Sequence, residues 1–204
     1  LEKKLIDEWP MRLAMKMVDY LVTGTKTVGD YYQKEFNLAR SKIKIIPNWV
    51  NLKRFKIEKD KKQLRKDLGL PLNKKIVIFA HRLAPRKGAD YLPKIISSTI
   101  NKIPDSWFFI AGGGGGALKN WLENEFVKKG LSPYIHLSSG IPNVDLPGYL
   151  AAADVLIMPS RQEGFPRVLL EAMATGVPFV ANNVGGTKDI ISSAQASYLV
   201  SVGD

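Results

Sequence analysis

The 204-residue sequence contains no cysteine, so disulfide bonds, a thiolate nucleophile and cysteine-ligated zinc are all excluded. No apolar run approaches the roughly 18 residues that a membrane-spanning helix requires. The N-terminus, Leu1-Glu2-Lys3-Lys4, has neither an initiator methionine nor the basic, apolar and small-residue order of a secretory signal. We therefore interpret the start as an internal cut and expect a cytoplasmic protein, with peripheral association at the inner membrane surface left open.

Acidic residues are few relative to basic ones: 30 Lys and Arg stand against 19 Asp and Glu, which gives a net charge of +11. That balance favours an anionic partner such as a phosphate, a nucleic acid or an acidic membrane, without choosing among them. Basic residues are densest between positions 53 and 66, where acids are interspersed and no aromatic platform is available for stacking bases. We interpret that stretch as a solvated linker and helix face.

Short apolar runs alternate with amphipathic stretches of helical length, and this order predicts a parallel sheet with crossover helices. The predicted strands are 20–23, 44–46, 76–80, 107–111, 134–137, 155–158, 178–181 and 198–200. The predicted helices are 26–36, 61–68, 90–101, 118–129, 146–153 and 167–175. The expected fold class is therefore α/β, with a doubly wound, Rossmann-like parallel sheet.

One change of composition divides the chain near residue 50. Pro47 to Asn51 opens an irregular stretch, the basic segment follows, and regular alternation resumes at Lys75. We expect residues 1–50 to be the last helix, strand, helix and strand of a preceding Rossmann-like domain, together with a linker. Residues 51–204 are expected to form a second, nearly complete domain of this kind that lacks its last helices.

In an open parallel sheet, ligands bind outside the carboxyl ends of the strands. The loops that follow the predicted strands at this edge are rich in cations, glycines and carboxylates. In chain order they contribute Arg82 and Lys87, the glycine run 112–116, Gly140 and Ile141, and Glu163. This edge of the sheet is the candidate binding site.

Glu163 and Glu171 are separated by seven residues and flank the start of a predicted helix. Pro166 is placed at the first helical position, which leaves the amides of Arg167 and Val168 free to bind an anion at the positive end of the helix dipole. Glu171 shares a helix face with Arg167, so its carboxylate is expected either to accept bonds from vicinal hydroxyls or to form a surface ion pair. Taken singly, Glu171 is better explained as half of a surface ion pair with Arg167, and Glu163 as an acid near the N-terminus of the helix.

The whole string from Pro159 to Pro178 resembles the donor-site signature of the family 4 retaining glycosyltransferases, which belong to the glycosyl transferases of group 1 and have the GT-B fold. His81-Arg82-Leu83 with Lys87-Gly88 is similar to the family's "G-R-L, then K-G" motif. Residues 109–114 resemble its glycine turn, and residues 137–142 its base-contacting loop. Ile46-Pro47-Asn48 resembles its interdomain motif, so that the resemblance covers residues 20–200.

This resemblance implies that the chain is the donor-binding half of a retaining enzyme that uses a nucleoside-diphosphate sugar. The N-terminal acceptor domain is then mostly missing, and an anionic lipid or a polysaccharide is the expected acceptor. Glu163 would be the catalytic residue facing the donor sugar, Glu171 would hold the ribose hydroxyls, and Arg82 with Lys87 would grip the diphosphate. The implied donor-binding set is Arg82, Lys87, Gly112, Gly140, Ile141, Gly164, Phe165, Pro166, Arg167, Val168, Leu169 and Glu171.

The sequence departs from the family pattern at three places. His81 replaces the usual glycine, Trp49 and Asn51 replace the glycine and aspartate of the interdomain motif, and Pro166 stands where glycine is commonest. None of these changes removes a charged ligand, although the proline forfeits one amide donor. His81 and His136 are expected to serve packing or loop structure.

No Asp-x-Asp pair is present to hold a divalent metal against a diphosphate. We therefore predict no metal and no cofactor, with protein cations and helix amides neutralising the leaving group. The base would be held mainly by backbone groups near residues 140–142, so the sequence leaves UDP, GDP and ADP open as the nucleotide.

Two other function classes stay open at this point. Gly112 to Ala117 satisfies the fingerprint of a dinucleotide-binding oxidoreductase. That fingerprint, however, expects the first strand of its unit and an acidic residue about 20 positions on, where the sequence reads Leu137-Ser138-Ser139. The second alternative is a non-enzymatic basic module that binds nucleotides or nucleic acid, supported by the net charge alone. We expect no nucleic-acid partner.

Overall fold

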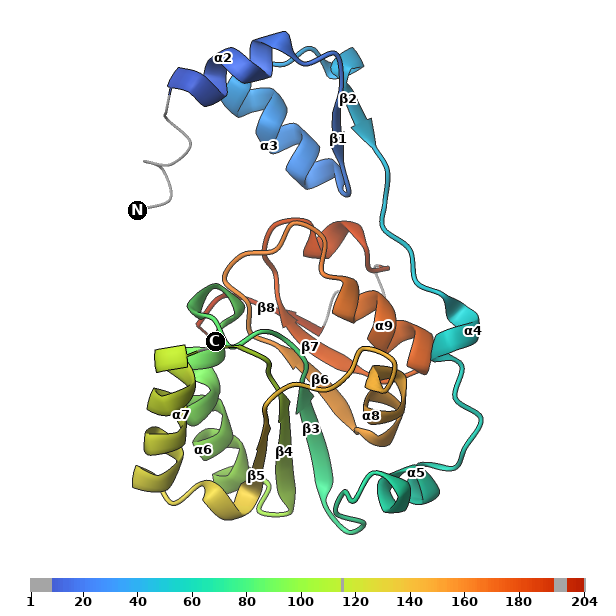
Figure 1. Cartoon of the computed structure of the whole chain (residues 1–204), viewed down its shortest axis with the longest axis vertical. Coiled ribbons are helices and arrows are strands. Elements are labelled where there is room, and N and C mark those ends of the chain that lie inside the picture. The colour runs from blue at the N-terminus through green and yellow to red at the C-terminus, as the bar shows by residue number, and fades with distance from the viewer. Residues whose placement is uncertain (1–8, 115, 193–197, 204) are drawn as a thin grey trace.

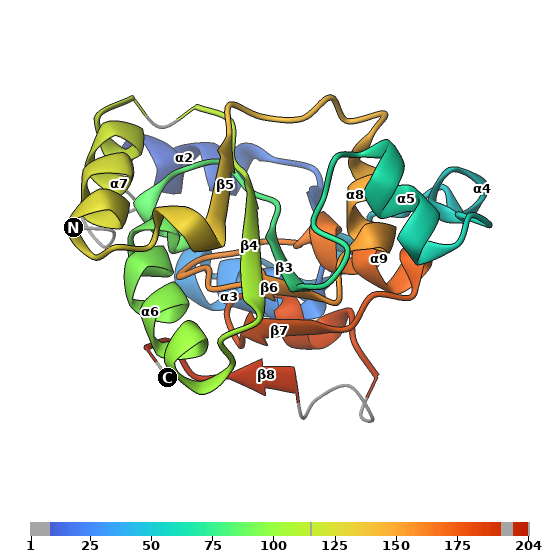
Figure 2. The ribbon, with the colours of Figure 1, turned by 90° about the horizontal axis from the view of Figure 1, so that it is seen from below.

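The computed structural model describes residues 9–114, 116–192 and 198–203. Its main body is a six-stranded sheet with helices on both faces, and a smaller N-terminal unit lies above it (Figures 1 and 2). The strands are β3 Lys75–Phe79, β4 Ser106–Ala111, β5 Ile135–Ser138, β6 Val155–Met158, β7 Phe179–Asn182 and β8 Leu199–Val200. The helices are α5 Lys61–Asp67, α6 Leu92–Lys102, α7 Gly116–Lys128, α8 Leu146–Ala152 and α9 Arg167–Thr175. All strand pairs are parallel, which confirms the predicted α/β class.

The order of the strands reverses once, between β3 and β6. Across the sheet the order is β5-β4-β3-β6-β7-β8, so the chain runs outward from β3 to β5 and then returns to the other side of β3. Val77 and Ile78 of β3 pair directly with Val155 and Leu156 of β6. Ligands bind at such a switch point in open α/β sheets, because the loops that leave the two central strands diverge there.

Side-chain alternation along β3 builds the two halves of the core. Ile76 and Ile78 point into a cluster that includes residues of α5, α8 and α9. Val77 and Phe79 point to the opposite face, where they pack with residues of α6 and α7. Because both faces of β3 are covered, its sequence reads as a continuous apolar run.

The N-terminal unit consists of α2 Trp9–Met17, β1 Leu21–Thr23, α3 Lys26–Phe36 and β2 Ile43–Ile45. Its two strands pair in parallel, and its core is a small cluster of Phe36, Leu38 and Ile43. The helix, strand, helix and strand that the sequence predicts are therefore present. The division of the chain into domains near residue 50 stays a prediction.

The bounds of the predicted elements differ from the structure by two residues at most. Helix α6 begins at Leu92 because a 3-10 turn, Ala89–Tyr91, precedes it. Among the α-helices of the described residues, the sequence analysis did not predict the short helix α4, Leu52–Phe55, and gave no bounds for α2. Helix α4 has a local cause, since the side chain of Asn51 accepts a hydrogen bond from the amide of Arg54 and caps the first turn.

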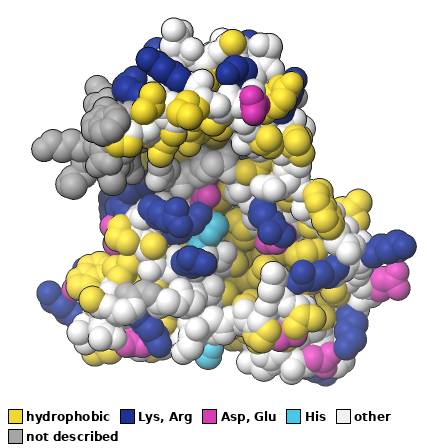
Figure 3. Space-filling model, turned by 45° about the horizontal axis from the view of Figure 1, so that its top comes forward, with side chains coloured by type: hydrophobic (Ala, Val, Ile, Leu, Met, Phe, Trp, Pro, Cys, Tyr) yellow, Lys and Arg dark blue, Asp and Glu magenta, His cyan; other side chains and the backbone are white. Residues whose placement is uncertain are grey.

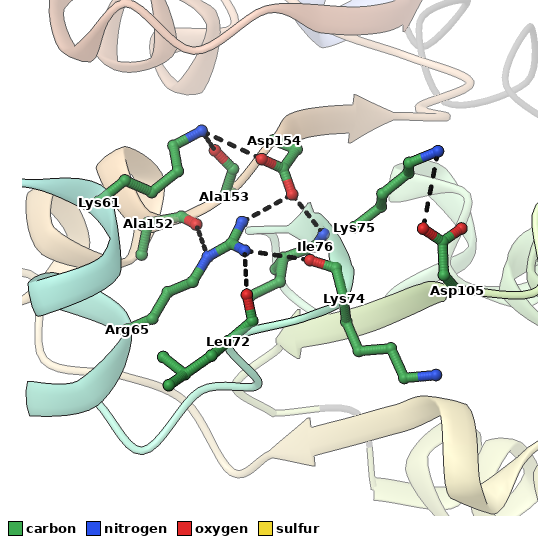
Figure 4. A network of polar contacts seen from close by, with 10 residues as sticks. All are labelled: Lys61, Arg65, Leu72, Lys74, Lys75, Ile76, Asp105, Ala152, Ala153 and Asp154. Carbon is green, nitrogen blue, oxygen red and sulfur yellow. Dashed lines mark hydrogen bonds and ion pairs between the residues drawn. The ribbon is translucent and has the colours of Figure 1, made fainter.

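A buried arginine corrects the prediction that the basic segment 53–66 is solvated throughout. Arg65 of α5 is 7% exposed and donates to the carbonyl of Ala152 and, at 2.7 Å, to Asp154 (Figure 4). Asp154 also accepts the Ile76 amide at 2.7 Å and the ammonium of Lys61 at 3.1 Å. Burial raises the pKa of Asp154, but these hydrogen bonds outweigh it and lower the pKa below its usual value. The network ties α5 to the starts of β3 and β6.

Candidate functional site

A cleft of about 550 Å³ opens at the carboxyl edge of the sheet, beside the β3–β6 switch point. Its wall is formed by the loops that follow β3, β4, β5 and β6, together with the first turns of α9. Figure 3 shows basic, acidic and histidine side chains gathered in a hollow below the N-terminal unit. The predicted residues on the wall are Arg82, Lys87, Gly140, Ile141, Glu163, Phe165, Pro166, Arg167, Val168 and Glu171.

Three predicted residues do not line the cleft. The side chain of Leu169 is completely buried in the core between α9 and the sheet, so it contributes packing. Gly112 lies beneath Leu83, where an added Cβ would come within 2.5 Å of the leucine side chain. Gly164 instead uses its carbonyl, which accepts a hydrogen bond from the hydroxyl of Thr25 in the N-terminal unit at 3.4 Å. A donor-binding role for these three residues stays a prediction.

The central polar contact of the cleft joins Lys87 to Glu163. The ammonium lies 2.7 Å from Oε1 and 2.8 Å from Oε2, and the hydroxyl of Ser160 donates to Oε1 at 2.7 Å. Glu163 is 7% exposed, so the pair is largely shielded from water. Burial of an unpaired carboxylate is costly, and the ammonium and the hydroxyl supply the partners that offset this cost.

Two glycines hold this pair in place through close backbone approaches. Gly88, which ends the 3-10 turn that carries Lys87, has a φ of +69°, and an added Cβ would lie 1.9 Å from the carbonyl oxygen of Pro159. Gly185 has a φ of +51°, and an added Cβ would lie 1.7 Å from the carbonyl oxygen of Glu163. Only glycine fits such positions without displacing the loop after β6.

Glu171 of α9 is a buried acid whose carboxylate has no partner among the described residues. It is 8% exposed and lines the cleft, and neither carboxylate oxygen forms a hydrogen bond or salt bridge with them. Burial raises its pKa, while the positive charges of Arg167 and Arg54 partly oppose that shift. The surface ion pair with Arg167 that the sequence left open is therefore not formed, and the carboxylate is available to accept hydrogen bonds from a ligand.

The start of α9 differs from the prediction by one residue. Pro166 is the N-cap, with φ −76° and ψ 89°, and Arg167 is the first helical residue. The proline therefore stands outside the helix, and its carbonyl accepts the amide of Leu169 at 3.1 Å. The amides of Arg167 and Val168 form no hydrogen bond within the described chain, and both residues line the cleft. These two amides are the donors that the sequence predicts for an anion, and that role stays a prediction.

Arg82 is a cation of the cleft whose side chain has no partner among the described residues. It is exposed, and its guanidinium forms no hydrogen bond or ion pair with them. It lies three residues after the end of β3 and lines the same cleft as the start of α9. An anion bound there would meet Arg82 and the helix amides together.

The cleft also contains residues outside the predicted set of donor-binding and catalytic residues: Ala80, His81, Ala111, Gly113, Asn143 and Leu146. Asn143 is held by Arg54, whose guanidinium donates to its side-chain oxygen at 2.7 Å. The two residues lie 89 positions apart in the sequence, so no local pattern predicts their contact. His81 was expected to serve packing, but its place directly before Arg82 was a usable signal for the site.

Metal and membrane features were searched over the same described residues. No group of three or more His, Asp or Glu side chains is placed to hold a metal ion there. No described helix is both long enough and apolar enough to cross a membrane. The expectation that the protein needs neither metal nor cofactor stays a prediction.

The dinucleotide-binding alternative is not supported by the fold. Its fingerprint requires the glycines to follow the first strand of the unit. Here the first strand is β3, which is followed by His81 and Arg82, whereas the glycine run follows β4. The glycines therefore belong to a different loop of the sheet.

Comparison with protein families assigns the sequence to a known family. Residues 60–204 match the family described as "Glycosyl transferases group 1". The chain is 32% identical, over 98% of its length and 52% of the relative's, to the UDP-Gal:alpha-D-GlcNAc-diphosphoundecaprenol alpha-1,3-galactosyltransferase of Escherichia coli. It is 34% identical, over 74% of its length and 36% of the relative's, to the putative teichuronic acid biosynthesis glycosyltransferase TuaC of Bacillus subtilis. Neither this match nor the fold supports a separate nucleic-acid-binding module.

Comparison with solved structures gives the same fold. Anabaena Alr3699/HepE, solved in complex with UDP and glucose, superposes with a TM-score of 0.82 at 23% identity, over 94% of this chain and 52% of that one. The C-terminal domain of the group 1 glycosyl transferase LpcC from Francisella tularensis superposes with a TM-score of 0.67 at 25% identity, over 76% of this chain and 81% of that domain. The chain spans about half the length of the E. coli relative, and about a third of TuaC.

Proposed function

Because the chain belongs to the group 1 glycosyl transferases, we propose that its cleft binds a nucleoside-diphosphate sugar and supplies the donor site of a sugar-transfer reaction. The observation that carries this proposal is the combination of groups in one cleft. Arg82 and the amides of Arg167 and Val168 are hydrogen-bond donors that could bind an anion, and they have no partner among the described residues. The buried carboxylate of Glu171 is an acceptor that likewise has no partner there. A molecule with a diphosphate and a vicinal diol satisfies both sets at once.

The proposed nucleotide is UDP. The cleft of about 550 Å³ has a size that is typical of sites for cofactors and nucleotides. The E. coli relative is named for UDP-Gal, and the Anabaena structure holds UDP. The Arg54–Asn143 contact, next to the loop that contains Gly140 and Ile141, gives this end of the cleft a fixed shape in which a base is held by backbone groups.

The proposed acceptor is a lipid-linked or polysaccharide sugar that carries negative charge. The net charge of +11 favours such a molecule, and the E. coli relative is named for a diphosphoundecaprenol-linked acceptor. A lipid-linked acceptor would place the reaction at a membrane surface, so we also propose a peripheral association with the inner surface of the membrane. The acceptor site would lie in an N-terminal domain to which the unit with β1 and β2 belongs.

We propose that transfer proceeds with retention and without a metal. The bond between the anomeric carbon and the diphosphate oxygen breaks while the acceptor oxygen attacks the same face, and the departing diphosphate takes the acceptor proton. Arg82, Lys87 and the first amides of α9 stabilise the negative charge that develops on the diphosphate. Glu163 positions the sugar and stabilises positive charge on its ring. A nucleophilic Glu163 is not required, because the departing diphosphate itself receives the acceptor proton.

Calorimetric titration of this chain with UDP, GDP and ADP tests the proposal. We expect UDP to bind most tightly, and Glu171→Gln to weaken its binding because the ribose hydroxyls lose a charged acceptor. Glu123→Gln, a change of the same kind on the exposed side of α7, is the control and should bind UDP normally. The proposal is wrong if none of the nucleotides binds while single-stranded nucleic acid binds with a steep salt dependence.

A further inference from the structure

His81 contains an unsatisfied polar atom at the edge of the proposed donor site. Its Nε2 is fully shielded from solvent and has no hydrogen-bond partner among the described residues. The imidazole is 11% exposed and packs edge-on against Phe79, with ring centroids 5.8 Å apart. Buried polar atoms are paired in the great majority of cases, so the absence of a partner needs a physical reason.

The unsatisfied nitrogen faces the carboxylate of Glu163. Nε2 lies 4.0 Å from Oε1, which is about 1 Å longer than an N–H···O hydrogen bond. Burial lowers the pKa of His81 to about 4, against the opposing effect of the Glu163 charge. At neutral pH the ring is therefore uncharged and carries a single N–H, which suits it to donate one hydrogen bond without adding a charge.

Lys87 supplies most of the hydrogen bonds that the carboxylate of Glu163 accepts. Oε1 accepts from Lys87 and Ser160, whereas Oε2 accepts from Lys87 alone. A diphosphate that binds beside Arg82 competes for the same ammonium, because Lys87 also lines the cleft. If the ammonium turns toward the diphosphate, Ser160 is the one donor to the buried Glu163 carboxylate that remains among the described residues, and that arrangement is unfavourable.

We propose that His81 is a positioning residue that takes over the Glu163 carboxylate when a diphosphate draws Lys87 away. A shift of about 1 Å converts the 4.0 Å approach into an Nε2–H···Oε1 hydrogen bond. Glu163 then keeps its place while the lysine charge acts on the diphosphate. The identity of the ligand rests on the proposed function, but the exchange of partners on Glu163 is a property of these side chains themselves.

Imidazole nitrogen-15 NMR of the chain tests the exchange directly. The protein has two histidines, so His136→Gln assigns the signals of His81. Lys87→Met removes the cation without any nucleotide, and we expect its His81 Nε2 to show a protonated, hydrogen-bonded signal with a slowly exchanging N–H. Saturation of the wild type with UDP should produce the same change. Lys128→Met, at an exposed lysine of α7, is the charge-matched control and should leave the signals of His81 unchanged.

Unchanged His81 signals in Lys87→Met would overturn the inference. A failure of UDP, GDP and ADP to bind the wild type would instead contradict the proposed function, because the comparison with Lys87→Met requires no nucleotide. The two failures are therefore distinguishable.

Binding to His81 variants separates positioning from packing. His81→Phe keeps a ring but has no donor, whereas His81→Gln places an amide nitrogen near the position of Nε2. We expect His81→Phe to weaken UDP binding about tenfold, the loss expected for one hydrogen bond to a charged group, because Lys87 then leaves Glu163 without a replacement donor. His81→Gln should restore the affinity. In the Lys87→Met background no exchange of partners takes place, so adding His81→Phe there should leave UDP affinity unchanged. An equal loss from His81→Phe in both backgrounds would make His81 a direct diphosphate ligand or a packing residue and contradict the proposal.

Discussion

Lys87 and Glu163 form a bidentate contact, with the ammonium 2.7 Å and 2.8 Å from the two carboxylate oxygens. Lys87, which we propose binds the diphosphate, is thus held by Glu163, which we propose contacts the donor sugar. This pairing couples the two halves of the proposed donor site, because any ligand group that binds Lys87 changes the hydrogen bonds of Glu163 as well.

The coupling predicts that Glu163→Gln does not weaken UDP binding. The amide keeps the size of the side chain and a contact to Ser160, but its weaker hold on Lys87 leaves the ammonium freer to bind a diphosphate. UDP affinity should be equal to that of the wild type or a few-fold higher, while the additional affinity for a UDP-sugar is lost. Calorimetry with both ligands measures this difference. A loss of UDP affinity as large as that in Glu171→Gln would show that the two acids do not have separate roles.

Arg82→Ala and Lys87→Ala should both weaken UDP binding tenfold or more, since a charge-assisted hydrogen bond is worth about 1.5–3 kcal/mol. Their effects on stability should differ. Arg82 is exposed and unpaired among the described residues, so its loss should leave the free energy of unfolding unchanged. Lys87→Ala leaves Glu163 buried without its cation, which should cost about 3 kcal/mol. Urea unfolding measures the difference, and Arg86→Ala, at the exposed neighbour of Lys87, is the control. Normal UDP binding by both variants would mean that the phosphate position is wrong.

Much of the fold and the location of the site could be predicted from local pattern. The apolar strands and amphipathic helices determine the parallel sheet, and a parallel sheet places the loops with Arg82, Glu163 and the start of α9 at one edge. The pattern could not show that Glu171 lacks an ion pair with Arg167. That outcome depends on how deeply α9 is buried, and the depth is set by the packing of its apolar side chains in the core.

Contacts between segments far apart in the sequence could not be predicted from the sequence patterns. Arg65 looks like one more cation of a solvated run, yet it is buried because its guanidinium finds acceptors on Ala152 and Asp154. Thr27 and Asp189 meet although 162 positions separate them. Such pairings follow from tertiary packing, and a periodic pattern within one element carries no information about them.

Glu171→Gln should stabilise the protein at neutral pH while weakening UDP binding. Burial raises the folded-state pKa of Glu171 above its usual value of 4.5. The folded state therefore binds the proton more tightly, and stability falls as the pH rises from the unfolded-state pKa through the folded-state pKa. The variant removes this penalty at pH 7 but gains nothing at pH 4, where the acid is mostly protonated. Thermal unfolding at both pH values checks the sign, with about 2–4 °C expected per kcal/mol for a chain of this size. A variant that is less stable than the wild type at pH 7 would contradict the prediction.

Gly185→Ala should disturb the site more than Gly176→Ala, although both glycines have positive φ angles of +51° and +74°. An added Cβ at Gly176 meets nothing within 4 Å, so that variant should lose about 1 kcal/mol from backbone strain alone. At Gly185 the Cβ would lie 1.7 Å from the carbonyl oxygen of Glu163, and the loop must move. We expect a larger loss of unfolding free energy, together with reduced UDP-sugar binding. Equal losses in the two variants would show that the close approach is relieved without moving Glu163.

A second contact between the N-terminal unit and the main body joins Thr27 of α3 to Asp189. Asp189 accepts the amide of Thr27 at 2.6 Å and its hydroxyl at 2.9 Å, so a carboxylate from the main body caps the first turn of α3. The contact is exposed, and its loss should cost about 1 kcal/mol, as for other helix caps.

Asp189→Ala should therefore accelerate hydrogen exchange at the Thr27 amide and at the other amides in the first turn of α3, while exchange in β3 and β4 stays as in the wild type. Asp30→Ala removes the same charge from an exposed ion pair with Lys26 on α3 and is the control. If the control accelerates exchange at the Thr27 amide as much as Asp189→Ala does, the cap does not hold the first turn. If exchange instead rises equally in α3, β3 and β4, the contact stabilises the fold as a whole and is not a local tie between the two parts.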